Sequence, residues 1–143
     1  MAPTRSQLLQ VATAVVDGFS KWTIEDVMAP RSQNCIHHML PASLEKPPFS
    51  NDELSVWLEQ IMAVVPNGFN MMYDKDACVV DKVTRKVVLY AKATAETKAG
   101  PFHNEYVFTI TVNEEGTLAD RVEEWMDSKL SLDILARLAN LTN

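Results

Sequence analysis

The stretch GPFHNEYVFTITV, residues 100–112, shows the clearest alternation of apolar and polar residues in the chain. Successive side chains of a β-strand point to opposite faces of a sheet. One face of residues 102–112 carries Phe102, Asn104, Tyr106, Phe108, Ile110 and Val112. The other carries His103, Glu105, Val107, Thr109 and Thr111. The first face is far more apolar, so we expect it to point inward and to bury an amide and a phenol. Burying such polar groups without partners costs about 1–3 kcal/mol each.

The same test applies to residues 118–127, which form the next predicted strand. Its apolar face holds Leu118, Val122, Glu124 and Met126, and its other face holds Arg121, Glu123, Trp125 and Asp127. The pattern therefore predicts one inward carboxylate, that of Glu124. A short strand is predicted over residues 35–40, CIHHML, within a loop of residues 31–48. Each face of that strand carries one histidine, so the alternation does not choose between His37 and His38.

Helices and further strands are predicted around these segments. Thr4 with Gln7 and Ser50 with Glu53 have the spacing of capping boxes, and Thr23 with Asp26 opens a short helix that ends before Pro30. Apolar residues then recur at helical spacing after each cap. The remaining predicted elements are strands near 70–80 and 86–97 and a C-terminal helix near 131–141. The order α-α-β-α-β-β-β-β-α predicts a single α+β domain over residues 1–143, with a strongly curved antiparallel sheet covered by helices on one face. Such a cone encloses a cavity, where ligand sites are common.

Composition excludes several functional classes. The chain has 143 residues, 47% hydrophobic and 22% charged, with a net charge of −6. This charge disfavours nucleic acid, because no basic patch offsets it. No apolar run approaches the ~20 residues of a membrane helix. The two cysteines and three histidines lack metal-ligand spacing, and no nucleotide motif is present, so we expect no cofactor. An N-terminus that turns polar at once and two free thiols predict a cytoplasmic protein.

The inward polar set suggests acid–base chemistry. A carboxylate in an apolar cavity has its pKa raised by desolvation, which suits a proton-transfer catalyst, and histidine can serve as the proton partner. The predicted catalytic residues are Glu124, His37 and His38. The predicted substrate-binding residues are Arg31, Asn104, Tyr106, Phe108 and Met126. Taken singly, such polar groups are more often satisfied by neighbouring backbone, and a lone arginine such as Arg31 is more often solvated.

The opposite face of the sheet carries polar, charged and aromatic residues together, a mixture that is unusual for a surface exposed only to solvent. It presents Thr109, Thr111, Glu123, Trp125 and Asp127. An exposed tryptophan on a sheet suggests a partner, and a homodimer through the outer sheet face fits this pattern.

These motifs together resemble the NTF2-like superfamily, in its SnoaL-like branch. The resemblance is carried by Arg31 shortly before CIHHMLPASL, then by GPFHNEYVF, then by VEEWMDS with Glu124. The chain is most similar to the small cofactor-free isomerases and cyclases of fungal meroterpenoid biosynthesis. The match is collinear over nearly the whole chain.

The resemblance implies a cone-shaped fold, a homodimer and a deep hydrophobic cavity for an oxygenated terpenoid. Related epoxide hydrolases and polyketide cyclases keep an acid on the last long strand, where Glu124 stands. The epoxide hydrolases also have an Arg and an Asp two residues apart on the preceding long strand. Here LYAKATAET offers Lys92, Thr94 and Glu96 instead. The expected function is therefore a cofactor-free isomerase or cyclase that rearranges a polycyclic meroterpenoid. The alternatives are a non-catalytic ligand-binding domain and a dehydratase or hydrolase on the same fold.

Overall fold

A computed structural model describes residues 2–141. The prediction of one domain over residues 1–143 extends to residues 1, 142 and 143, which lie outside the described residues. The elements, in chain order, are α1 (Arg5–Lys21), α2 (Ile24–Met28), β1 (Arg31–Leu40), η1 (Ala42–Leu44), α3 (Asn51–Val64), β2 (Asn70–Tyr73), η2 (Lys75–Ala77), β3 (Val79–Asp81), β4 (Lys86–Thr97), β5 (Gly100–Val112), β6 (Ala119–Met126) and α4 (Ser128–Asn140).

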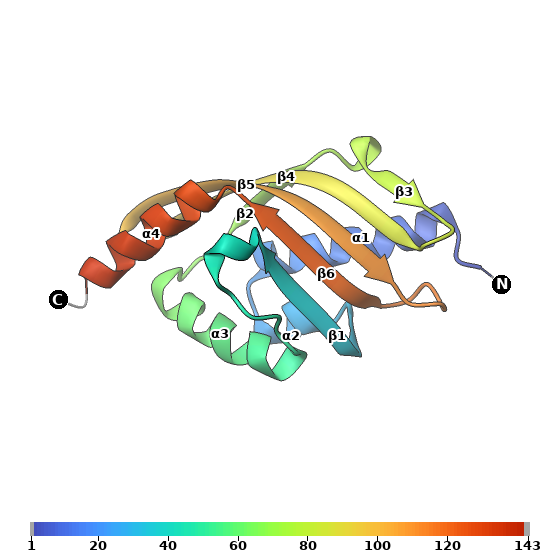
Figure 1. Ribbon diagram of the computed structural model, residues 1–143, viewed down its shortest axis with the longest axis horizontal. Coiled ribbons are helices and arrows are strands. Elements are labelled where there is room, and N and C mark those ends of the chain that lie inside the picture. The colour runs from blue at the N-terminus through green and yellow to red at the C-terminus, as the bar shows by residue number, and fades with distance from the viewer. Residues whose placement is uncertain (1, 142–143) are drawn as a thin grey trace.

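The sheet is a curved layer with strand order β1-β6-β5-β4-β2, and β3 pairs with β4. It arches over α1, α2 and α3, while α4 lies along one end of the arch (Figure 1). This confirms the α+β class and the curved sheet covered by helices. The sheet is mixed, however, because β1 runs parallel to β6. A fully antiparallel sheet was the wrong prediction for this pair, since β1 and β6 are far apart in sequence and no hairpin fixes their direction.

On β5, the alternation of the two predicted faces agrees with the burial of each residue. Every even-numbered residue from Phe102 to Val112 is buried, and the odd-numbered ones are exposed or half-buried. The buried face packs on α1 and α3 as the main apolar core. Full burial of one such large apolar side chain contributes about 1.5–3 kcal/mol. On β6, Ala119 replaces Leu118 as the first buried residue, because the β5–β6 register shifts next to Val112.

Helix starts follow the predicted caps. The capping boxes at Thr4 and Ser50 are both formed, and the Thr23 hydroxyl accepts the N–H of Asp26. The C-terminal helix begins earlier than predicted, at Ser128, because the Asp127 carboxylate accepts the N–H groups of Lys129 and Leu130. An aspartate that ends one strand therefore also begins the next helix.

Two other predicted boundaries were wrong. The strand expected near 70–80 is divided into β2 and β3, because the Asp74 carboxylate accepts the N–H of Asp76 and turns the chain through η2. The loop expected from residue 31 is already strand, since β1 begins at Arg31, which lies opposite Ala119 of β6. This difference brings Arg31 into the interior.

One glycine fixes the wall of the cone beside α1. Gly68 has φ +76°, and a Cβ there would lie 2.7 Å from the Trp22 side chain. The Trp22 indole N–H in turn donates to the Val65 carbonyl at 2.7 Å. Only glycine allows both the left-handed backbone and this close approach. The contact sets Trp22 and the neighbouring Phe69 edge to face, at 5.0 Å between ring centroids.

Candidate functional site

A cavity lies between the inner sheet face and the helices. Its walls are apolar and come from α1, α3, β5, β6, α4 and the segments that follow β1 and α3. The volume is about 140 Å³, close to that of a cavity that holds one benzene molecule. The mouth reaches solvent beside Leu135 of α4, a residue that is itself exposed. The site is therefore an apolar hollow with an open end, so a ligand larger than the enclosed volume would extend through the mouth.

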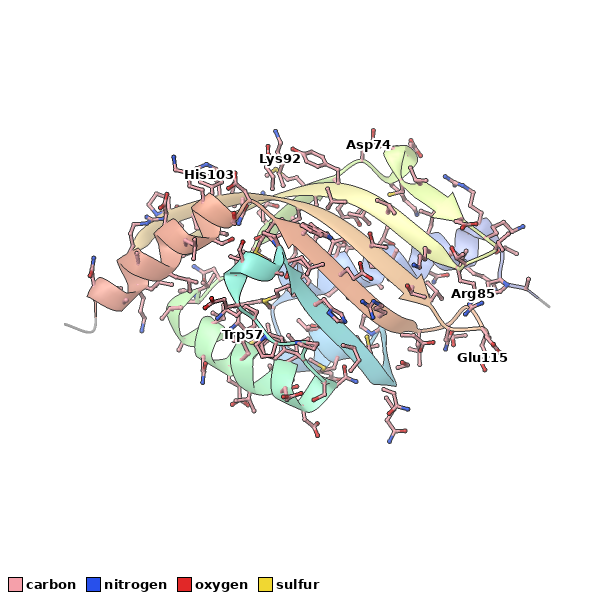
Figure 2. All side chains as sticks on the ribbon, in the orientation of Figure 1. Trp57, Asp74, Arg85, Lys92, His103 and Glu115 are labelled. Carbon is pink, nitrogen blue, oxygen red and sulfur yellow. The ribbon has the colours of Figure 1, made fainter. Side chains whose placement is uncertain are left out.

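The inner face of β4 carries small buried residues. Ala91 lies opposite Tyr106, and Ala93 lies opposite Asn104. The polar residues of the same strand, Lys92 and Thr94, are exposed on the other face. Figure 2 shows Lys92 on the convex side of the sheet, away from α1 and α3. The inner face of β4 therefore offers no counterpart of the Arg and Asp pair of the epoxide hydrolases.

Glu124 projects from β6 into the cavity, opposite Phe108 on one side and Met39 on the other. The residue is 8% exposed. Within residues 2–141, the only hydrogen bond to its carboxylate comes from His37, at 3.3 Å between Nε2 and Oε1. One carboxylate oxygen is thus held, and the other is left for a ligand.

His37 lies behind Glu124 and is 1% exposed. Its strand is fixed by paired backbone hydrogen bonds to Phe49, each 2.9 Å long. Its Nδ1 lies 3.1 Å from Nη1 of Arg31. A guanidinium can only donate, so Nδ1 accepts and the ring proton sits on Nε2, facing Glu124. Burial lowers the pKa of His37, opposed by its hydrogen bond to Glu124. The imidazole is therefore a neutral, oriented donor.

Arg31 completes this chain of contacts from the start of β1. It is 6% exposed, and its Nε donates to the Val27 carbonyl at 3.1 Å. Burial lowers the pKa of Arg31, while its interactions with Cys35 and Glu124 act to raise it. A guanidinium nonetheless stays charged in proteins. Contrary to the prediction of substrate contact, Arg31 does not line the cavity but lies behind His37. It is not solvated either.

Tyr106 stands beside Glu124 on the neighbouring strand and lines the cavity. Its ring stacks on Phe108 with 5.5 Å between centroids. Burial, and then the charge of Glu124, raise the pKa of the phenol well above its usual range, so it stays protonated. No hydrogen bond reaches its hydroxyl from any described residue, and buried phenols normally have a partner. The hydroxyl is therefore a donor that awaits a ligand.

Asn104 also faces inward, but its amide is already engaged. Its Nδ2 donates to the Ser131 hydroxyl at 2.9 Å. Its Oδ1 accepts the backbone N–H groups of Glu105 and Asp127, at 2.7 and 3.2 Å. These contacts hold the first turn of α4 against β5. Asn104 thus shapes the cavity wall, with at most one amide hydrogen left for a ligand.

The remaining predicted site residues divide between the two faces of the sheet. Phe108 and Met126 line the cavity. His38 points the opposite way, toward the outer face that carries Arg121 and Glu123, and burial lowers its pKa. Its Nε2 is buried and lacks a partner among the described residues. The structure thus separates the two histidines, which the alternation left open.

Ser131 and Lys46 are among the cavity residues that the sequence interpretation missed. Ser131 could have been found, because Ser131, Ile134, Leu135 and Leu138 have the i, i+3, i+4, i+7 spacing of one helix face. Lys46 lies in irregular chain, where no periodicity applies. Among residues 2–141 there is no cluster of three side chains able to hold a metal ion. None of the helices in that range has the length and apolar character needed to cross a membrane.

Comparison with known proteins places this fold and site in a family. No protein-family model matches the chain. Austinoid biosynthesis clusters protein H of Penicillium brasilianum is 34% identical over 129 residues, which make up 90% of this chain and 88% of that protein. The crystal structure of BvnE pinacolase from Penicillium brevicompactum is 31% identical, with a TM-score of 0.88 over 95% of this chain and 93% of that one.

A SnoaL-like protein of Shewanella denitrificans shares the fold alone, with 10% identity and a TM-score of 0.74 over 92% of this chain and 98% of that one. Identity above 30% along almost the full length of relatives is a much stronger link than a shared fold. The chain therefore belongs to the family of the fungal austinoid biosynthesis cluster proteins and BvnE, and it has the fold of the SnoaL-like protein.

Proposed function

We propose that this protein is an isomerase or cyclase that rearranges an oxygenated polycyclic meroterpenoid by acid–base chemistry. The observation that carries the proposal is the pairing of a buried carboxylate, Glu124, with the unpartnered hydroxyl of Tyr106 in one apolar cavity. The family supports the substrate class, because its members include proteins of austinoid biosynthesis clusters and a pinacolase.

In this mechanism Glu124 acts as the general base. Its free oxygen takes a proton from an acidic C–H or from a hydroxyl of the substrate. The electron pair left behind forms an enolate or alkoxide, which the Tyr106 hydroxyl stabilises by a hydrogen bond. The alkoxide attacks a carbonyl, or the enolate is reprotonated elsewhere. The proton held by Glu124 is the one returned, either to the oxyanion that forms when the alkoxide attacks a carbonyl or to the new position on the enolate, so that substrate and product have the same atoms.

His37 and Arg31 support this base without touching the substrate. The Nε2–H of His37 holds one oxygen of Glu124, so the other oxygen keeps a fixed direction. Arg31 fixes the His37 tautomer from behind. His37 is therefore proposed as an orienting donor rather than as a base of its own, and His38 is left out of the chemistry.

The test of this function is the product mass. Purified protein is incubated with meroterpenoids that carry β-dicarbonyl, lactone or hydroxyl groups. The products are separated by liquid chromatography and their masses are measured by mass spectrometry. We expect a new peak of unchanged mass, which takes up deuterium when the reaction is run in heavy water. A product that gained or lost one water would make the protein a hydrolase or dehydratase. Tight binding with no conversion across the panel would make it a binding domain.

We also propose that the protein is a homodimer through its outer sheet face. Three large side chains form a row across adjacent strands there, since Tyr90 lies opposite Val107 and Val107 opposite Trp125. All three are exposed, with Trp125 47% exposed. Such a contiguous apolar row is typical of a protein interface.

Sedimentation velocity tests this proposal. We expect the wild type to sediment as a dimer and Trp125→Glu to sediment as a monomer, because a buried unpaired carboxylate opposes association. Val83→Glu is the matched control, since Val83 is exposed at the β3–β4 turn, outside the row. A monomeric wild type at tens of micromolar would exclude a stable dimer.

A further inference from the structure

The cavity has two charged side chains on its walls, of opposite sign. Glu124 is one, and Lys46 is the other. The two differ in setting: Glu124 is buried, whereas Lys46 is half-buried. The chemistry proposed above uses a carboxylate and a phenol and gives no role to Lys46. The presence of a cation at the wall of an apolar cavity is therefore still to be explained.

The segment that carries Lys46 is held at both ends. It leaves β1 after Leu40, passes through η1, and returns to pair Phe49 with His37 in a two-way backbone bridge. Pro47 and Pro48 follow Lys46 directly. Proline fixes its own φ and restricts the residue before it to extended conformations. Lys46 therefore has a defined backbone position, anchored to the strand that carries His37.

The Lys46 ammonium has no partner among residues 2–141. Neither a hydrogen bond nor an ion pair connects it to any other described residue, and the neighbouring Glu45 is exposed and unpaired. Lysine stems commonly cover apolar surface while the charged end stays at the water boundary. That geometry would place the ammonium at the cavity mouth, where it meets whatever enters. The partner of this charge is then supplied by the ligand.

We propose that Lys46 selects substrates that carry an anionic oxygen group, so that the cavity takes an apolar polycyclic acid. The anion pairs with Lys46, and the carbon skeleton lies along the apolar wall toward Tyr106 and Glu124. The carboxylate of Glu124 repels an anion, so the two charges together fix which end of the ligand enters first. This inference rests on the proposed function insofar as the cavity is the substrate site.

A matched pair of probes tests the proposal without any turnover. Abietic acid is a three-ring diterpenoid carboxylate at neutral pH, and abietinol is the same skeleton with an uncharged alcohol. Binding is followed by the fluorescence of Trp57 and Trp22, which line the cavity. We expect the acid to bind wild type about tenfold or more tightly than the alcohol at low salt, the factor typical of a charge-assisted contact.

The variants separate Lys46 from general electrostatics. Lys46→Gln is expected to remove the preference for the acid, and Lys46→Arg is expected to keep it. Lys82→Gln removes the same charge from the exposed β3–β4 turn and should change nothing. Equal affinities of wild type for acid and alcohol would overturn the proposal. So would a preference that survives in Lys46→Gln, or a wild type that binds neither probe at millimolar concentration.

A further variant distinguishes this inference from the proposed function. Glu124→Gln removes the repelling charge but leaves Lys46 in place, so it should bind the acid at least as tightly as wild type does. If Lys46 selects the acid while no meroterpenoid is rearranged, the inference stands and the isomerase proposal fails. If a meroterpenoid is rearranged but Lys46→Gln has no effect on affinity, the isomerase proposal stands and the inference about Lys46 fails.

Discussion

Glu124→Gln is expected to lower the rate of rearrangement about 10²–10⁴-fold, the range for removal of a general base. The amide has nearly the same shape as the carboxylate and can still accept the Nε2–H of His37 through its oxygen. It cannot take a proton from carbon or from a hydroxyl at neutral pH. The loss should therefore appear in the chemical step, with the affinity for substrate largely kept.

Measurement of kcat and KM separately checks this expectation. The matched control is Glu123→Gln, because Glu123 is the neighbouring residue on β6 but faces outward and pairs with Arg121 at 2.6 Å. Glu123→Gln should unfold within about 1 kcal/mol of wild type in urea, and Glu124→Gln should still show a cooperative unfolding transition. A Glu124→Gln protein that is folded and turns over at the wild-type rate would remove Glu124 from the mechanism.

The inner face of the sheet was the part of the molecule most open to prediction from sequence. On β5 a strict period of two matches the burial of every residue from Phe102 to Val112. The same period placed Glu124 of β6 inside. The reason is physical: a one-residue slip would turn all these apolar side chains to water, so the register is strongly determined.

The contact partners of those inward residues could not be predicted from the alternation. Adjacent histidines on one strand necessarily face opposite ways, and His37 is inward because Glu124 and Phe49 lie against it from distant parts of the chain. Asn104 was predicted to contact substrate, yet its amide holds Ser131 and the start of α4. Alternation predicts a side chain's direction but carries no information about what another segment places in front of it.

Arg31 shows the same limit more strongly. A lone arginine beside a predicted loop is most often solvated. Here the loop is the first part of β1, and the side chain turns inward between Val27 and His37. The signal that places it is the pairing of Arg31 with Ala119, which joins segments far apart in sequence. The burial of the Arg31 side chain could therefore not be predicted before the parallel pairing of β1 with β6 was known.

Arg31→Met is expected to destabilise the fold by about 3–5 kcal/mol, the range for breaking a buried ionic arrangement on one side. The substitution leaves Nδ1 of His37 without its donor and removes the cation that offsets the Glu124 charge. Methionine fills much of the same volume, so lost packing contributes little. Urea unfolding gives the free energy. Arg121→Met is the control, because the Arg121–Glu123 pair lies on the outer face and the Arg121 side chain is half-exposed. Its expected cost is below about 1 kcal/mol.

The cause of that loss can be isolated by combining Arg31→Met with Glu124→Gln. If Arg31 stabilises the protein by offsetting the carboxylate, the double variant must lose less than the sum of the two single losses, because neither charge is then left buried alone. The expected coupling is about 0.5–3 kcal/mol. Strictly additive losses would mean that Arg31 stabilises the protein only through its hydrogen bonds to Val27 and His37, and the electrostatic link from Arg31 to the Glu124 carboxylate would have to be abandoned. Coupling of the expected size would instead show that Arg31 stabilises the Glu124 carboxylate from behind, on the side away from the cavity.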